Sequence, residues 1–171
     1  MLTDDPNYVL HRLHQRYRKF QQRARYSRAR SDDPRKELAG RVEHLALATL
    51  HRMGYRVSRC GYNDPWDLWC NGARIEVKGS TWSGRRYQAA IRNHRADVLL
   101  FGCQPPNNEL VFFVIPVRAY AHTRNIAVWT EDPAMYDGQW AEYYQAWWYL
   151  DATINRLPAH RGWQPALFEV M

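Results

Sequence analysis

Apolar residues recur at intervals of three and four along two stretches of the chain, which predicts two amphipathic helices. The first stretch is 7–30, with an apolar stripe of Leu10, Leu13, Tyr17, Phe20 and Ala24. The second runs from Asp33, which can cap a helix that begins at Pro34, to Gly54, which can end it in the left-handed conformation. We expect its buried face to consist of Leu38, Val42, Leu45, Ala46, Thr49, Leu50 and Met53.

Short apolar or alternating segments after Gly54 predict strands. We expect them at 55–60, 66–70, 73–78, 97–103 and 110–115, with 126–130 as a further strand or edge. Residues 87–91 fit a strand or a helix equally. Residues 139–154 fit a helix with one aromatic and aliphatic face, formed by Trp140, Tyr143, Trp147, Leu150 and Ile154.

The dipeptide Asn71-Gly72 between two of these segments predicts a β-hairpin with a two-residue type I′ turn. This turn pairs Cys70 with Ala73, Trp69 with Arg74, Leu68 with Ile75, and Asp67 with Glu76. One face of the hairpin is then apolar throughout and consists of Leu68, Cys70, Ala73, Ile75 and Val77. The opposite face consists of Asp67, Trp69, Arg74, Glu76 and Lys78.

The predicted register puts two carboxylates, Asp67 and Glu76, at a non-hydrogen-bonded pair, where Cα atoms approach to about 4.5 Å. Like charges in this position destabilise a sheet. Lys78 on the same face would offset the repulsion in part, and a divalent cation would do so more fully. Oxygen ligands favour Mg²⁺ or Mn²⁺ over zinc. The alternative is a solvated Asp/Glu/Lys network, and Glu43 at the border of the second helix's apolar face is a candidate third acid.

The order of these motifs resembles the PD-(D/E)XK nuclease superfamily, which has the restriction-endonuclease-like fold. The resemblance rests on Glu43 in a helix, Asp67 in Pro65-Trp66-Asp67, and Glu76-Val77-Lys78 on the paired strand, and covers roughly residues 34–116. It implies an α/β fold with a central mixed β-sheet flanked by helices. A tryptophan separates the proline from Asp67, which makes Asp64 the alternative acid. We prefer Asp67 because Asp64 would point to the opposite face of an extended strand.

By this resemblance, Asp67, Glu76 and the backbone carbonyl of Val77 bind Mg²⁺, with Mn²⁺ as a substitute. Glu43 reaches the same ion directly or through water, and Lys78 positions or activates the attacking water and stabilises charge on the scissile phosphate. The implied activity is a Mg²⁺-dependent DNA endonuclease of restriction, homing, junction-resolving or defence type. The alternative function is a catalytically silent DNA-binding or scaffolding module on the same fold. Nuclease domains of this size commonly act as dimers, so a homo-oligomer is a further expectation.

The charge of the chain is unevenly distributed. The 171 residues, 46% of them apolar, carry a net charge of +7, and residues 1–31 alone hold eight basic and two acidic side chains. We therefore expect a basic helical arm at 1–31 and a nuclease-like domain at 32–171. Within the arm, Arg12, Arg16, Lys19 and Arg23 form a second stripe. This stripe suits a DNA backbone, and a solvated face or a subunit contact is the equal alternative.

Further candidates for contact with nucleic acid follow the predicted hairpin, namely Ser80, Arg85, Arg86 and Gln88, with Arg92 and Arg95 beyond them.

Three cysteines without a CxxC pair predict free thiols in a reducing compartment. No apolar run approaches the roughly 20 residues of a transmembrane helix, and the first residues lack the pattern of a secretory signal. The expectation is a cytoplasmic protein with DNA as its partner and no membrane attachment.

Overall fold

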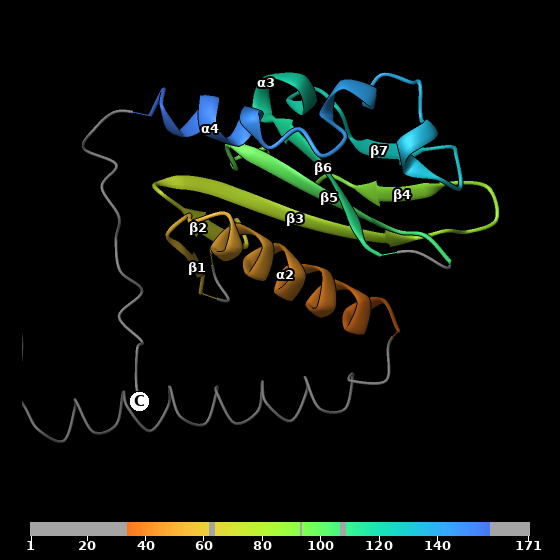
Figure 1. The fold of residues 1–171 in the computed structure, drawn as a ribbon, viewed down its shortest axis with the longest axis horizontal. Coiled ribbons are helices and arrows are strands. Elements are labelled where there is room, and N and C mark those ends of the chain that lie inside the picture. Colours follow the sequence, from red (N-terminus) through yellow and green to blue (C-terminus); the bar gives the residue numbers. More distant parts are fainter. Residues whose placement is uncertain (1–33, 62–63, 93, 107–108, 158–171) are drawn as a thin grey trace, which may run out of the picture. The chain divides into compact units, whose positions relative to one another are not determined.

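The computed structural model describes residues 34–61, 64–92, 94–106 and 109–157 (Figure 1). The chain separates into two compact units, Met1–Glu37 and Leu38–Met171, and the elements below belong to the second unit apart from the start of the first helix. The predicted arm helix and its basic residues Arg12, Arg16, Lys19 and Arg23 lie outside the described residues, as does the predicted cap Asp33.

A five-stranded mixed sheet is the centre of the fold, with strand order β1-β2-β3-β5-β6. Its strands are β1 (Val57–Arg59), β2 (Leu68–Cys70), β3 (Ala73–Thr81), β5 (Val98–Gln104) and β6 (Val111–Pro116). The β3–β5 pair is parallel, and the other neighbours are antiparallel. The prediction of an α/β fold with a central mixed sheet flanked by helices is therefore confirmed.

Two further strands, β4 (Tyr87–Ala90) and β7 (Asn125–Val128), pair with each other in a separate antiparallel sheet. Residues 87–91, whose pattern fitted a strand or a helix, thus contain a strand. Because β4 lies between β3 and β5 in the chain, it is part of their parallel crossover connection, which in most proteins contains a helix.

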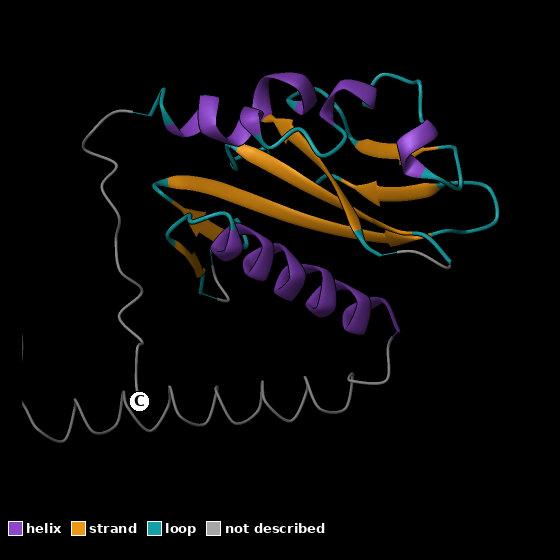
Figure 2. Ribbon diagram, viewed as in Figure 1, coloured by secondary structure: helices purple, strands orange, loops and turns teal. Residues whose placement is uncertain are grey.

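The helix α2 (Pro34–Arg52) runs along one side of the central sheet, as Figure 2 shows. It ends as predicted at Gly54, whose φ of +86° allows the Tyr55 N–H to bond the Leu50 carbonyl at 3.1 Å. Val42 and Leu50 are fully buried on its inner face. Met53, predicted to be buried there, is 43% exposed because the helix has ended and Met53 lies in the terminating turn.

A close contact between α2 and the sheet depends on two glycines. Gly79 on β3 pairs with Gly102 on β5, and Val42 of α2 lies over both. A Cβ added at Gly79 would lie 2.6 Å from Val42 Cγ2, and one added at Gly102 would lie 2.7 Å from Val42 Cγ1. The missing side chains therefore let the helix approach the two central strands, which fixes the position of the neighbouring residue Glu43.

The two faces of the sheet contribute to two separate apolar clusters. The predicted apolar face of the hairpin is confirmed, since all five of its residues are buried in the cluster that contains the inner face of α2. The other cluster contains buried residues of β5, β6 and the small sheet, among them Leu99, Phe101, Phe113, Tyr87 and Ile126. Glu76 is buried and Lys78 half-buried on β3, in the alternating positions that face away from the first cluster.

The prediction of a single helix at 139–154 is wrong. This segment contains a 3₁₀ turn, η2 (Ala141–Tyr143), and the short helix α4 (Trp148–Ile154). Between them, Tyr144 forms a bridge to Phe113, and the Gln145 N–H bonds the Phe112 carbonyl at 2.8 Å with a φ of +49°. Backbone pairing with β6 therefore interrupts the helical pattern. The short helix α3 (Val117–Tyr120) directly follows β6.

Candidate active site

The hairpin register is confirmed for the three pairs nearest the turn, Leu68 with Ile75, Trp69 with Arg74, and Cys70 with Ala73. Asn71 and Gly72 both have positive φ, +47° and +87°, as a type I′ turn requires. The predicted pair of Asp67 with Glu76 is wrong: the Asp67 N–H bonds the Ile75 carbonyl at 2.9 Å. Asp67 and Leu68 thus share one partner residue, which is the arrangement of a β-bulge.

The bulge directs the Asp67 carboxylate onto the backbone of β3. Oδ2 of Asp67 accepts a hydrogen bond from the Val77 N–H at 2.7 Å. Within an extended strand, the N–H and C=O of one residue point to the same edge, so the Val77 carbonyl also faces this side. Lys78 Nζ lies 3.5 Å from that carbonyl oxygen. The Asp67 carboxylate therefore contacts Val77, at the centre of the Glu76-Val77-Lys78 segment. It does so through a hydrogen bond to the backbone and not as a cross-strand partner of Glu76.

Glu76 and Lys78 form an ion pair on the half-buried face of β3. The Glu76 side chain is 9% exposed and that of Lys78 is 29% exposed. The pKa of Glu76 is raised above its usual value chiefly because burial disfavours the charged form, while Lys78 opposes this rise. The negative charge of Asp67 adds to the rise.

A second ion pair lies on the same face of the sheet, at the beginning of β3 and β5. Arg74 donates from Nε and Nη2 to the two oxygens of Asp97, at 2.9 and 2.7 Å. The buried Tyr120 hydroxyl, which donates to the Ala96 carbonyl at 2.9 Å, has its pKa raised by burial and then by the charges of Glu76 and Asp97. Asp97 is not among the candidate residues predicted from the sequence, although an acid directly before an apolar strand is a usable signal.

The structure places Glu43 on the outer border of α2. Its carboxylate lies 3.3 Å from Arg59 Nε on β1, and the two side chains are 30% and 50% exposed. Burial raises the pKa of the nearby Cys60 thiol to about 12, with further contributions from Asp64, Asp67 and Glu43. The Cys60 N–H also donates to the Asp67 carbonyl at 2.9 Å, which joins the segment after β1 to the segment before β2.

The donor atoms at this site suit a hard divalent cation with few protein ligands. Within residues 34–157, gaps excepted, no three side chains of His, Cys, Asp or Glu are arranged to hold a metal ion. Mg²⁺, however, commonly keeps several waters and is held by one or two carboxylates together with substrate phosphates. Asp67, Glu76 and the Val77 carbonyl could supply such a partial set of oxygen ligands.

Tryptophans cover the neighbourhood of Asp67. The rings of Trp66 and Trp69 meet edge to face with centroids 5.3 Å apart, and the Arg74 guanidinium lies 5.3 Å from the Trp66 ring centroid. These contacts fix the segment that leads into β2, so the position of Asp67 is held by packing as well as by its hydrogen bond.

The predicted residues after the hairpin fall into two groups. Ser80 and Gln88 lie together, because Ser80 Oγ accepts the Gln88 N–H at 2.9 Å and so joins β3 to β4. Arg85 and Arg86 are exposed in the loop that connects these strands. Among the described residues, no hydrogen bond joins any of these four residues to the carboxylates of Asp67 or Glu76.

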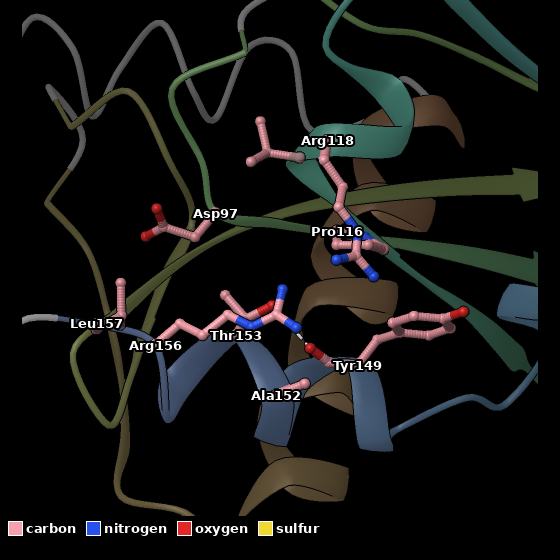
Figure 3. Close-up of a pocket in the computed structure, with 9 residues that line it drawn as sticks. Asp97, Pro116, Arg118, Tyr149, Ala152, Thr153, Arg156 and Leu157 are labelled. Atoms are coloured by element: carbon pink, nitrogen blue, oxygen red, sulfur yellow. Dashed lines mark hydrogen bonds between the residues drawn. The ribbon is translucent and has the colours of Figure 1, made fainter.

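An open pocket of about 190 Å³ lies between α3, α4 and the start of β5 (Figure 3). Arg118 and Arg156 line it together with Asp97, Tyr149 and Thr153. The Arg118 guanidinium lies 5.8 Å from the Tyr149 ring centroid. Asp97, which forms the ion pair with Arg74, lies on the wall of this pocket, and none of the predicted site residues lines it.

No protein-family model matches the chain, and no curated protein matches it. Among solved structures, it is similar to a bacterial homing endonuclease, I-Ssp6803I, with a TM-score of 0.55 and 20% sequence identity. The similarity covers 67% of this chain and 89% of that one. The fold is thus one that a homing endonuclease also has. No described helix has the length and apolar character to cross a membrane, and all three cysteines are free.

Proposed function

We propose that this protein is a DNA endonuclease of the PD-(D/E)XK type that hydrolyses phosphodiester bonds with Mg²⁺ or Mn²⁺. The observation that carries the proposal is the Asp67 carboxylate on the Val77 N–H, next to the Glu76–Lys78 ion pair. The fold similarity to I-Ssp6803I, a bacterial homing endonuclease, supports it. The sequence order of Glu43, Asp67, Glu76 and Lys78 supports it independently.

In this proposal the side chains of Asp67 and Glu76 and the carbonyl of Val77 hold the metal ion. A bound Mg²⁺ polarises a phosphoryl oxygen and lowers the pKa of a coordinated water. Lys78 would move from its pair with Glu76 to hold the attacking water or to neutralise charge on the phosphate. Glu43, now paired with Arg59, would contribute from α2 through water.

The remaining parts of the proposal concern the substrate and assembly. DNA phosphates would be contacted by Arg85 and Arg86, and by the basic residues of the arm at 1–31. A homodimer would place one site on each strand of a duplex. The cytoplasm is the proposed location.

A plasmid cleavage assay tests the activity. Wild type, Asp67→Asn and Lys78→Met are incubated with supercoiled, linear and branched DNA, with and without Mg²⁺. We expect cleavage only with the metal, and a loss of about 100-fold or more in both variants. The exposed residues Asp137 and Lys36 provide matched controls, Asp137→Asn and Lys36→Met, which should retain the wild-type rate. No cleavage by wild type, or equal cleavage by the site variants, would contradict the proposal.

A catalytically silent DNA-binding module is the second candidate. The observation that favours it is that Glu43 and Lys78 are each engaged in an ion pair, with Arg59 and Glu76 respectively. This candidate predicts DNA binding that weakens steeply with salt and no hydrolysis with either metal.

A further inference from the structure

The two strands β4 and β7 form a ribbon whose two faces differ in character. Side chains alternate between the faces, so each cross-strand pair belongs to one face. The inner pairs are Tyr87 with Val128 and Ala89 with Ile126, and they contribute to an apolar cluster. The outer pairs are Gln88 with Ala127 and Ala90 with Asn125. Three of the four outer residues are exposed, and Ala127 is half-buried.

The outer face combines two amide side chains with two alanines, which is an unusual composition for a solvated strand surface. Gln and Asn can each donate to and accept from the edge of an adenine in the major groove. Alanine contacts the thymine methyl group and is short enough to let the backbone approach the bases. No charged or bulky side chain of β4 or β7 lies on this face.

Resting on the DNA endonuclease function proposed above, we infer that the β4–β7 ribbon enters the major groove and reads base pairs through Gln88 and Asn125. The major groove is wide enough for a two-stranded ribbon. A strand of four residues spans about 14 Å, which corresponds to about four base pairs. The recognition element would thus combine β4, from the crossover between β3 and β5, with β7, which follows α3 in the chain.

The charge around the ribbon fits a duplex. Residues 77–96 and 110–130, which include both strands, contain no Asp or Glu, and the nearest acids after β7 are the exposed Glu131 and Asp132. Arg85 and Arg86 precede β4, while Arg92 follows it and Arg124 precedes β7, and all four are exposed. Because the strands are antiparallel, these arginines lie in pairs at the two ends of the ribbon. Cations at both ends can meet the phosphates on either side of the groove.

The ribbon is held firmly on the rest of the molecule. The Tyr87 hydroxyl donates to the Glu131 carbonyl at 2.6 Å, and Tyr87 and Ile126 are fully buried. The hydrogen bond from the Gln88 N–H to Ser80 Oγ joins the ribbon to β3, two residues beyond Lys78. A reading surface must be rigid to discriminate between bases, and these contacts supply that rigidity.

The same geometry separates DNA from RNA. An RNA duplex has a deep and narrow major groove that side chains cannot read. We therefore expect the ribbon to prefer a DNA duplex over an RNA duplex of the same sequence.

A binding selection tests the inference. The full chain is incubated in Ca²⁺, without Mg²⁺ or Mn²⁺, with a pool of 30-base-pair DNA duplexes whose centre is randomised, and the bound duplexes are sequenced. We expect wild type to enrich a short motif that contains A·T pairs. Gln88→Ala and Asn125→Ala should each lose preference at one or two positions, by about tenfold, while affinity for unselected DNA changes less than twofold.

Two controls make the result specific. Gln139→Ala and Asn155→Ala remove exposed amides outside the ribbon and should leave the motif unchanged. A wild type that binds without enriching any motif, or a motif unaltered in Gln88→Ala and Asn125→Ala, would overturn the inference; equal binding of RNA duplexes would also overturn it. Failure of the endonuclease proposal alone would give a different result. Wild type would enrich a motif that Gln88→Ala and Asn125→Ala lose, but wild type would not cleave DNA in the presence of Mg²⁺.

Discussion

Asp67 and Val77 are joined by a 2.7 Å hydrogen bond in which the carboxylate before β2 accepts the backbone N–H of β3. This bond predicts different effects for two substitutions of Asp67. Asp67→Ala removes the acceptor of a partly buried N–H and should lower the free energy of unfolding by about 1.5–3 kcal/mol. Asp67→Asn keeps a neutral acceptor and should lower it by less than about 1 kcal/mol.

Both variants should lose metal-dependent cleavage, because each lacks the negative charge. Urea unfolding and a plasmid assay on the same preparations measure the two effects. An Asp67→Asn protein that cleaves DNA at the wild-type rate would show that the charge of Asp67 takes no part in the reaction.

The ion pair of Glu76 and Lys78 predicts coupling between these residues in stability. Lys78→Met leaves the Glu76 carboxylate in a largely buried position without its partner, which should cost about 1–3 kcal/mol at pH 7. Glu76→Gln removes the charge that Lys78 neutralises. The double variant should therefore be more stable than the sum of the single effects predicts, by about 1 kcal/mol. A double-mutant cycle by urea unfolding measures this term, and strict additivity would contradict the coupling.

The contact between Glu43 and Arg59 allows a test of Glu43 that separates catalysis from stability. Both side chains are about a third or more exposed, so Glu43→Gln and Arg59→Met should each change the free energy of unfolding by less than about 1 kcal/mol. Cleavage should fall in Glu43→Gln and persist in Arg59→Met. Equal activity of the two variants would remove Glu43 from the proposed site.

The packing of Val42 over Gly79 and Gly102 predicts a steric effect at either glycine. Gly79→Ala puts a methyl group 2.6 Å from Val42 and should destabilise the protein by about 1–3 kcal/mol. Val42→Ala removes the methyl groups that this side chain would meet. The double variant should therefore lose less stability than the single variants Gly79→Ala and Val42→Ala lose together. Gly40 on α2 has open space around its Cα, and the control Gly40→Ala should be neutral or stabilising by up to about 1 kcal/mol. Thermal or urea unfolding of all four variants measures these differences.

Features that depend on local chemistry could be predicted from the sequence. A helix that ends at Gly54 and a hairpin that turns at Asn71-Gly72 are each specified by a glycine in a left-handed position and by the adjacent periodicity. The hairpin register then follows, because one residue of slip would move every apolar side chain to the opposite face. This is why Asp67, Glu76 and Lys78 could be placed in one neighbourhood.

Features that depend on competition between distant segments could not be predicted in this way. The bulge at Asp67 arises because its carboxylate can bond the Val77 N–H, a choice that alternation along a strand does not reveal. The aromatic residues at 139–154 have helical spacing, yet Tyr144 and Gln145 gain backbone partners on β6. Likewise, the partner of β4 is β7, more than 30 residues further along the chain.

The strand β3 carries Lys78 and, two residues later, the Ser80 hydroxyl that holds β4. Along an extended strand, two residues amount to about 7 Å, and the residue between them, Gly79, is paired with Gly102 of β5. Under the two proposals, the spacing between the phosphate that is cut and the bases that are read is thus a property of one rigid strand. Such an enzyme would break DNA at a constant offset within or beside its target, and lengthening a loop elsewhere would not move the cut.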